Sequence, residues 1–177
     1  MSTEVERKAE ALLSEHGVES PPVPVDDLAK VVGLEIVYER FNGDDVSGML
    51  FRDGRRAPTI IVNSTDARVR QRFTVAHELG HFVLEHADQF YVSSTVRVSF
   101  RDRQSAMATK VDEMQANQFA ASLLMPRAFV DHGVNALLER DPDLDDESLT
   151  RCLAARFDVS ASAMQYRLIN LGYLGAI

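Results

Sequence analysis

Two histidines and a glutamate in the stretch QRFTVAHELGHFVLEHADQFY, residues 71–91, have a spacing that suits metal chemistry. His77 and His81 are four residues apart, so on a helix both rings can face the same ion. Glu78 follows the first histidine directly, where its carboxylate can reach a water molecule rather than the ion. This H-E-x-x-H pattern predicts a zinc site with Glu78 as the general base of a hydrolase, because zinc lowers the pKa of water from 15.7 to about 7.

The same residues have a second interpretation, which is a surface helix that happens to contain two histidines and an acid. The surrounding sequence argues against it, because large apolar residues flank the motif on several sides: Val69, Phe73, Val75, Leu79, Phe82 and Val83. Such a helix is expected to be central and buried. A buried His-Glu-His cluster without an ion would be costly, so the metal interpretation is favoured.

A third histidine, His86, follows nine residues after His77. Nine residues of a continuous helix turn by about 900°, which leaves His86 about 180° away from His77. The spacing also misses the metzincin pattern, in which the third histidine comes six residues after the second. We therefore predict that His86 is not a ligand unless the helix breaks first. It is interpreted as a polar residue near the helix C-terminus, where positive charge is favoured.

A zinc hydrolase needs a third protein ligand and one open position for water. The segment KVDEMQANQFAASLLMP, residues 110–126, supplies candidates on a second helix. Glu113 shares a helix face with Asn117, and small residues close to that face would allow a tight approach to the first helix: Ala116, Ala120 and Ala121. Asp112 and Gln115 are the alternatives. Asp112 is shorter and rotated by about 100°, and Gln115 is a poor zinc ligand.

A small sheet and several helices must position these residues. Apolar spacing, turn residues and caps predict helices over residues 2–16, 26–33, about 65–85, about 108–124, 126–133, 147–156 and 160–171. Short apolar runs bounded by turn signals predict strands over 34–39, 46–52 and 59–63. We predict an α+β fold in which a sheet of about three strands packs on the central H-E-x-x-H helix.

The strand at 46–52 contains Gly48, which is typical of an edge strand or of a close backbone approach. An edge strand could pair with an extended peptide and lead its scissile bond past the metal. Alternatively, this strand simply completes the sheet. The sequence does not identify the residue that stabilises the oxyanion. Tyr91 and Arg97, which follow the motif helix, are candidates.

Composition narrows the setting of this chemistry. A chain of 177 residues suits one well-cored domain with at most a small appendage. The formal charge of −8 argues against a general nucleic-acid coat and against binding to anionic membranes. The N-terminus lacks the apolar run of a signal peptide, and Cys152 is the only cysteine. We therefore expect a cytoplasmic protein without a membrane span.

Longer stretches resemble a known family. VRQRFTVAHELGHFVLEH followed by DEMQANQFAASLLMP is similar to the IrrE/ImmA family of bacterial and phage metallopeptidases, and the similarity covers roughly residues 5–130. The resemblance implies that His77 and His81 are zinc ligands, that Glu78 is catalytic and that Glu113 is the third ligand.

Two further residues take their interpretation from this resemblance. Many members of the family have a second acid where this chain has Gln115, and that difference favours Glu113 as the ligand. By analogy with thermolysin-like sites, Asn117 would orient a ligand histidine. The resemblance also suggests a substrate, a helix-turn-helix repressor of the XRE type encoded nearby and cleaved at one or few sites.

The C-terminal part suggests a different function. We predict a zincin-like metallopeptidase domain over residues 1–138. An acidic linker and a helix-turn-helix-like pair, packed on the same domain, would follow over 139–177. A DNA reader would present Ser160, Ser162, Gln165, Tyr166 and Arg167 to a groove. Residues 146–177 carry three arginines and three acids, which is a weak basis for DNA affinity. The alternative function is thus a DNA- or protein-binding regulator, or an antitoxin-like module, with a structural zinc.

Overall fold

The structure is a computed structural model that describes residues 3–41, 46–52, 55–86, 90–94 and 103–175, with backbone alone for 90–94 and 103–109. The helices in these ranges are α1 (Glu4–Glu15), α2 (Val25–Val31), α3 (Arg68–Val83), α4 (Arg103–Leu124), α5 (Arg127–Arg140), α6 (Asp146–Phe157) and α7 (Ala161–Leu171). The strands are β1 (Glu35–Glu39), β2 (Val46–Phe51), β3 (Thr59–Asn63) and β4 (Phe90–Ser94).

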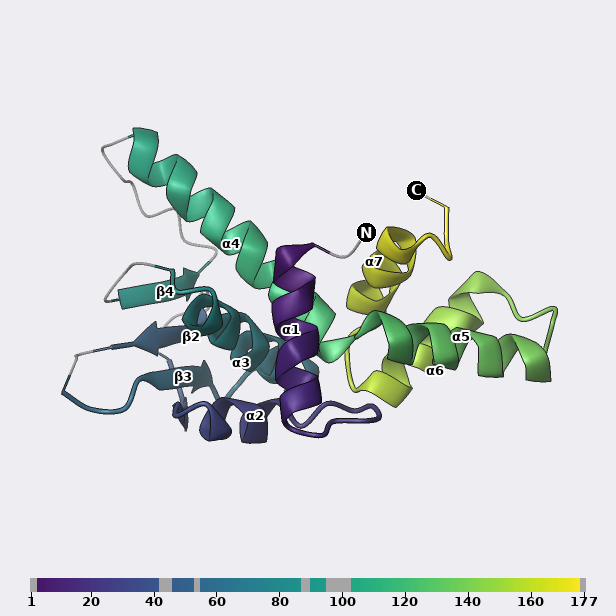
Figure 1. The fold of residues 1–177 in the computed structure, drawn as a ribbon, viewed down its shortest axis with the longest axis horizontal. Helices are drawn as coiled ribbons and strands as arrows, with labels where there is room; N and C mark the ends of the chain where they lie inside the picture. The colour runs from purple at the N-terminus through teal and green to yellow at the C-terminus, as the bar shows by residue number, and fades with distance from the viewer. Residues whose placement is uncertain (1–2, 42–45, 53–54, 87–89, 95–102, 176–177) are drawn as a thin grey trace.

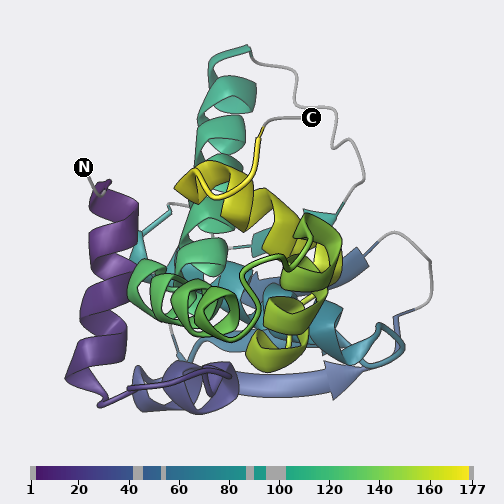
Figure 2. The ribbon, with the colours of Figure 1, turned by 90° about the vertical axis from the view of Figure 1, so that its right-hand side faces the viewer.

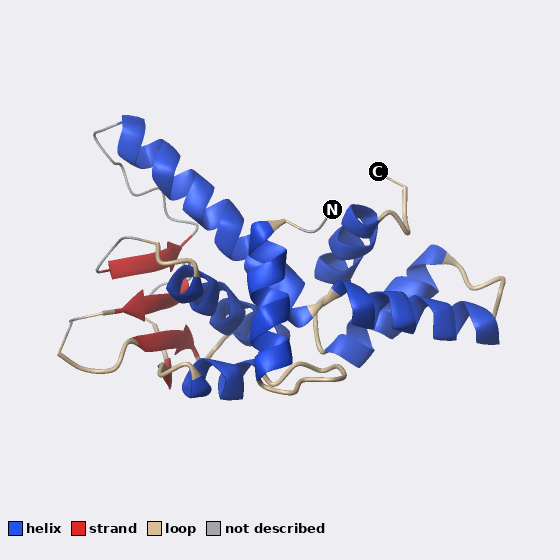
Figure 3. Cartoon of the chain, in the orientation of Figure 1, coloured by secondary structure: helices blue, strands red, loops and turns tan. Residues whose placement is uncertain are grey.

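The strands form one mixed sheet in the order β1-β3-β2-β4 (Figure 3). β1 runs parallel to β3, and the other two pairs are antiparallel. The α+β prediction is confirmed, and the three predicted strands are present together with a fourth, β4. Because β4 pairs with β2, β2 lies inside the sheet, so its prediction as a peptide-binding edge strand is wrong. β1 and β4 are the edges of the described sheet.

Gly48 in β2 marks a close approach between the sheet and α3. A Cβ atom at this position would overlap the methyl group of Thr74 and would lie 2.9 Å from the carbonyl oxygen of Ile61. Of the two interpretations of this glycine, an edge strand or a close backbone approach, the close approach is therefore the correct one. Without a side chain at residue 48, α3 can lie directly on the strand.

α3 lies in the middle of the molecule, with the strands on one side and α5, α6 and α7 on the other (Figure 1). Every residue from Thr74 to His81 is buried, as the apolar residues around the motif predicted. The helix begins at Arg68 without a side-chain cap, a few residues later than predicted. The Gln71 side-chain amide instead donates hydrogen bonds to three carbonyl oxygens before the helix, those of Asn63, Ser64 and Asp66.

α4 crosses α3 at very short range. A Cβ atom on Gly80 of α3 would lie 3.1 Å from Phe119 Cδ1 and 3.3 Å from the Cα atom of Ala116, both on α4. Ala116 and Ala120 are fully buried. The predicted close approach through small residues is confirmed. It brings the H-E-x-x-H residues of α3 next to the Glu113 segment of α4.

The C-terminal helices α5, α6 and α7 lie on the far side of α3 from the strands, as the two perpendicular views agree (Figures 1 and 2). α5 continues through Gly133 to Arg140, so the predicted stop at Gly133 is wrong. Gly133 is buried against α6. A Cβ atom at this position would lie only 2.8 Å from Leu153 Cδ2, so the close contact requires a glycine. Ser160 caps α7 and Gly172, at φ 85°, ends it, as predicted.

Within the described ranges, no helix combines the length and apolar character needed to cross a bilayer.

Candidate metal centre

Three side chains predicted as ligands come together where α3 and α4 cross. The Nε2 atoms of His77 and His81 are 3.0 Å apart. The carboxylate oxygens of Glu113 lie 3.3 Å from Nε2 of His77 and 3.8 Å from Nε2 of His81. Ligands about 2.0–2.2 Å from a tetrahedral ion lie roughly 3.3–3.6 Å from one another. The three groups therefore already stand at about the separations that one ion requires.

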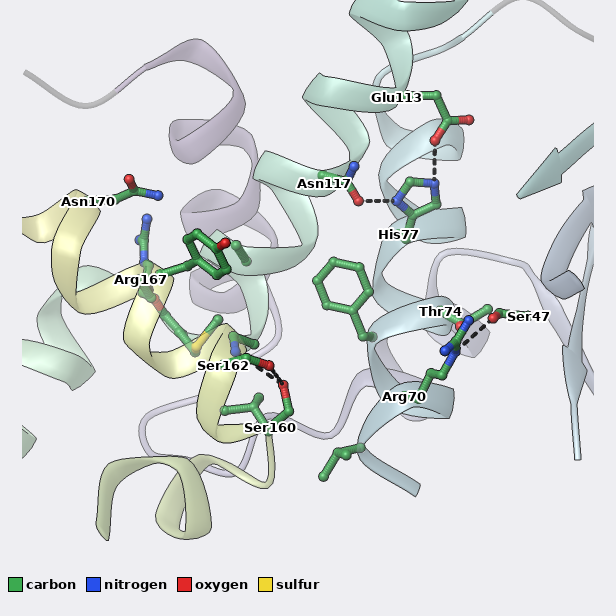
Figure 4. A pocket seen from close by; sticks show the side chains of 17 residues that line it. Ser47, Arg70, Thr74, His77, Glu113, Asn117, Ser160, Ser162, Arg167 and Asn170 are labelled. Carbon is green, nitrogen blue, oxygen red and sulfur yellow. Dashed lines mark hydrogen bonds and ion pairs between the residues drawn. The ribbon is translucent and has the colours of Figure 1, made fainter. Parts of the chain in front are cut away.

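The hydrogen bonds of the two rings determine which nitrogen carries the proton. Nδ1 of His77 lies 3.0 Å from Oδ1 of Asn117, an acceptor, so this nitrogen is the donor (Figure 4). Nδ1 of His81 lies 2.8 Å from Nδ1 of His86. With Nδ1 protonated in each ligand ring, the lone pairs of both Nε2 atoms point into the same space. Two imidazoles and a carboxylate in this arrangement fit zinc or a similar divalent ion.

His86 was predicted as a polar residue near a helix C-terminus, and the structure gives it a more specific environment. It is buried, and it contacts His81. α3 ends at Val83, Glu85 takes the left-handed conformation at φ 57°, and the amide of His86 donates back to the carbonyl oxygen of His81. The 180° rotation assumed a continuous helix, whereas the chain turns back at this point. His86 therefore meets a ligand ring instead of the ion.

The two alternatives to Glu113 are directed at His86. Oε1 of Gln115 accepts from Nε2 of His86 at 3.0 Å, and Oδ1 of Asp112 lies 3.7 Å from the same nitrogen. A chain of contacts thus runs from His81 through His86 to α4. Sequence patterns do not predict these contacts, because Glu85 is not a residue type that favours a left-handed turn. Its effect is to hold the His81 ring in one orientation and one tautomer.

Electrostatics separates the two ligand histidines. Burial, together with the nearby His77, His86 and Arg52, lowers the pKa of His81 to about 2, so this ring is neutral. Burial alone would lower the pKa of His77 as well, but its hydrogen bond to Glu113 and the charges of Glu78 and Glu113 raise it above its usual value. A metal ion would compete with a proton chiefly at His77.

Glu78 is fully buried on α3 and lies between His77 and His81 in the sequence. Its negative charge helps to raise the pKa of His77, the residue before it in sequence. A carboxylate in this position can accept and return a proton without binding the ion itself. Of the two candidates for stabilising an oxyanion, Tyr91 lies in β4, where only the backbone is described, and Arg97 lies outside the described residues.

A cavity of about 850 Å³ opens beside the cluster. Figure 4 shows His77, Glu113 and Asn117 at one end, α3 along one side and α7 along the other. Its size falls in the roughly 300–1,000 Å³ range of ligand-binding sites. Two of the three candidate ligands, His77 and Glu113, thus border a space that can hold a substrate.

Comparison with known proteins agrees with this geometry. The model of a peptidase family, described as the IrrE N-terminal-like domain, matches residues 29–169. The chain belongs to this family. The predicted IrrE/ImmA membership is confirmed, and the family match includes the motif helix, Glu113 and most of α7.

One curated relative of this family member is the radiation response metalloprotease IrrE of Deinococcus radiodurans, 34% identical over 121 residues. The match covers 67% of this chain and 34% of that protein, so it spans about a third of the relative's length. Among solved structures, a Mycobacterium tuberculosis transcriptional regulator has a similar fold, with a TM-score of 0.61 at 17% identity. That match covers 95% of this chain and 47% of the other.

Proposed function

We propose that this chain is a zinc-dependent endopeptidase with Glu78 as its general base. The observation that carries the proposal is the convergence of two Nε2 lone pairs and the Glu113 carboxylate beside a cavity of substrate size. His77, His81 and Glu113 would hold the ion, and Asn117 and His86 would fix the two rings. When bound, zinc supplies Lewis-acid chemistry, activating water and polarising the substrate carbonyl.

Glu78 moves the proton in this scheme. Its carboxylate takes a proton from the attacking water and later gives it to the nitrogen of the leaving amine.

We further propose that the natural substrate is a regulatory protein, a helix-turn-helix repressor of the XRE type, cleaved in the cytoplasm at one or few sites. The support is the resemblance to the IrrE/ImmA family and the name of the Deinococcus radiodurans relative, which links that protein to a radiation response. A repressor encoded beside the gene is the first candidate to incubate with the zinc-loaded protein.

The test compares Glu78→Gln with wild type. The variant keeps the shape of the side chain and the three ligands, so it should bind zinc at one ion per chain while peptide hydrolysis falls by about 10²–10⁴-fold. Glu139→Gln, the same substitution at an exposed position of α5, is the control and should retain full activity. Hydrolysis that survives Glu78→Gln would contradict the mechanism. Zinc binding without any hydrolysis in wild type would favour a regulator with a structural zinc.

A further inference from the structure

The cavity beside the metal cluster has α7 as its second wall. Ser160, Ser162, Ala163, Tyr166 and Arg167 line it from the C-terminal side. Four of these are among the residues that a DNA-reading helix would present to a groove. Figure 4 shows Ser160, Ser162 and Arg167 on the helix that lies across the cavity from His77. The face of α7 expected to meet DNA therefore faces the candidate active site.

Arg167 is the single cationic residue of α7, and its side chain is buried in the protein. The side chain of Arg167 is only 6% exposed. Its Nε donates to the carbonyl oxygen of Met125 at 2.9 Å, and its Nη1 lies 3.1 Å from Oε1 of Glu6. These contacts fix α7 against α4 and α1 and take its positive charge away from any phosphate. The contacts of Arg167 thus hold α7 in place as one wall of the cavity, and they leave α7 without a free positive charge that could attract DNA.

Apolar side chains from both sides of the cavity contribute to its wall, among ten polar side chains and Tyr166. They are Val69 and Phe73 of α3, Ala121 of α4, Met125 just after α4, Val159 just before α7, and Ala163 of α7. Tyr166 adds an aromatic ring that is 71% exposed. Exposed aromatic surface in a concave site is typical of binding, because ligands that cover it gain from leaving water. The same cavity reaches His77 and Glu113, so its occupant extends to the metal.

We propose that α7 and α3 form an apolar subsite that receives a large apolar side chain of the substrate, next to the scissile bond, with Tyr166 as a residue that determines specificity. This inference rests on the proposed peptidase function and adds a substrate class to it: peptides with an aromatic or large aliphatic residue beside the cleaved bond. The helix-turn-helix-like tail is then a part of the peptidase site.

Hydroxamates test the subsite without requiring catalysis, because they bind a metal ion and can carry a side chain of choice. The zinc-loaded full chain is titrated by calorimetry with acetohydroxamate, N-acetylalanine hydroxamate and N-acetylphenylalanine hydroxamate. In wild type the phenylalanine compound should bind at least about tenfold more tightly than the alanine compound, as expected for burial of an aromatic ring. Tyr166→Ala should reduce this preference severalfold, and Ala163→Asp should abolish it by placing a charge in the wall.

Matched controls separate the subsite from the metal centre. Gln165→Ala changes the neighbouring exposed residue of α7, which does not line the cavity, and should keep the wild-type preference. Acetohydroxamate should bind all variants equally. Equal affinity for the alanine and phenylalanine compounds, with acetohydroxamate still bound, would overturn the subsite and leave the peptidase proposal standing. Failure to bind zinc or acetohydroxamate would overturn both.

A DNA-binding assay distinguishes the rival function of α7. If Tyr166→Ala weakened binding to a DNA fragment while leaving the hydroxamate preference intact, the inference would be wrong and α7 would be a DNA reader. Because Tyr166 is exposed, the variant should unfold at the wild-type temperature, so a loss of preference would report the wall itself.

Discussion

The metal cluster and the C-terminal helix α7 both carry polar residues at regular helical spacing, yet the spacing proved informative in only one of them. His77 and His81 face each other as their four-residue separation requires. On α7, Ser160, Tyr166 and Arg167 have the order of a recognition helix, but they line the cavity that reaches His77 and Glu113, and Arg167 is buried. Spacing determines which side chains share a helix face. Packing determines whether that face meets solvent, and spacing does not contain that information.

The largest expected effect tests the cluster. Glu113→Ala removes a ligand, so we expect zinc affinity to fall by more than about 100-fold, beyond the 10–100-fold typical of losing a ligand's hydrogen-bond partner. Asp112→Ala, one residue earlier on α4, should have a much smaller effect because Asp112 faces His86. Competition with a chromogenic chelator measures both. Equal losses in the two variants would show that the cluster is not specified as described.

The next effect tests how α7 is held. Arg167→Met removes the contacts to Met125 and Glu6, so the mostly buried Glu6 carboxylate loses its ion pair with this arginine. We expect unfolding free energy to fall by about 2 kcal/mol, less than for a fully buried pair because Glu6 retains some exposure. Urea denaturation measures it, with Arg151→Met, at an exposed position of α6, as the control. A variant as stable as wild type would mean that α7 does not depend on this arginine.

A smaller effect tests the residue whose function the sequence did not reveal. His86→Ala frees the His81 ring to rotate and removes the acceptor of its Nδ1 proton. Zinc affinity should fall by about tenfold, the lower end of the range for such partners. His132→Ala, an exposed histidine of α5, should leave it unchanged. If His86→Ala binds zinc as wild type does, the contact between the two histidines has no part in holding the ion.

The smallest effect tests the crossing of the two helices. Gly80→Ala places a methyl group against Phe119 and the backbone of Ala116. Overpacking of about 1–3 kcal/mol is partly offset by a helix-propensity gain of about 1 kcal/mol, so we expect a net loss near 1 kcal/mol. Zinc affinity should fall too, because α3 and α4 are pushed apart. Gly175→Ala, where a Cβ atom meets nothing within 4 Å, is the control. An unchanged melting temperature and zinc affinity would show that the crossing tolerates a side chain.

Sequence patterns predicted the local part of this site and missed the part made by turns and distant contacts. The pair His77 and His81 follows from helix geometry alone. Glu113 could only be a candidate among neighbours on its own segment, since nothing local shows where α4 crosses α3. The contact of His86 with His81 was not predicted, because it depends on a left-handed turn at Glu85 and glutamate does not favour that conformation.

The fold shows the same division. The three predicted strands and the cap at Ser160 follow from short-range patterns. The neighbours of β2 do not follow from such patterns, because β4 comes from a stretch without clear alternation and its residues pair with residues 39 to 48 positions away. Likewise, Gly133 is a residue type that often ends a helix, but here it lies inside α5, where it allows close contact with Leu153.

The central claim is that His77, His81 and Glu113 hold one ion, and anomalous diffraction from zinc-loaded crystals tests it most directly. Data collected on both sides of the zinc absorption edge locate the ion independently of any assumed chemistry. We predict a single strong peak about 2.0–2.2 Å from Nε2 of His77, Nε2 of His81 and a carboxylate oxygen of Glu113. A peak bound by His86 or Asp112 instead, or no peak between α3 and α4, would contradict the account.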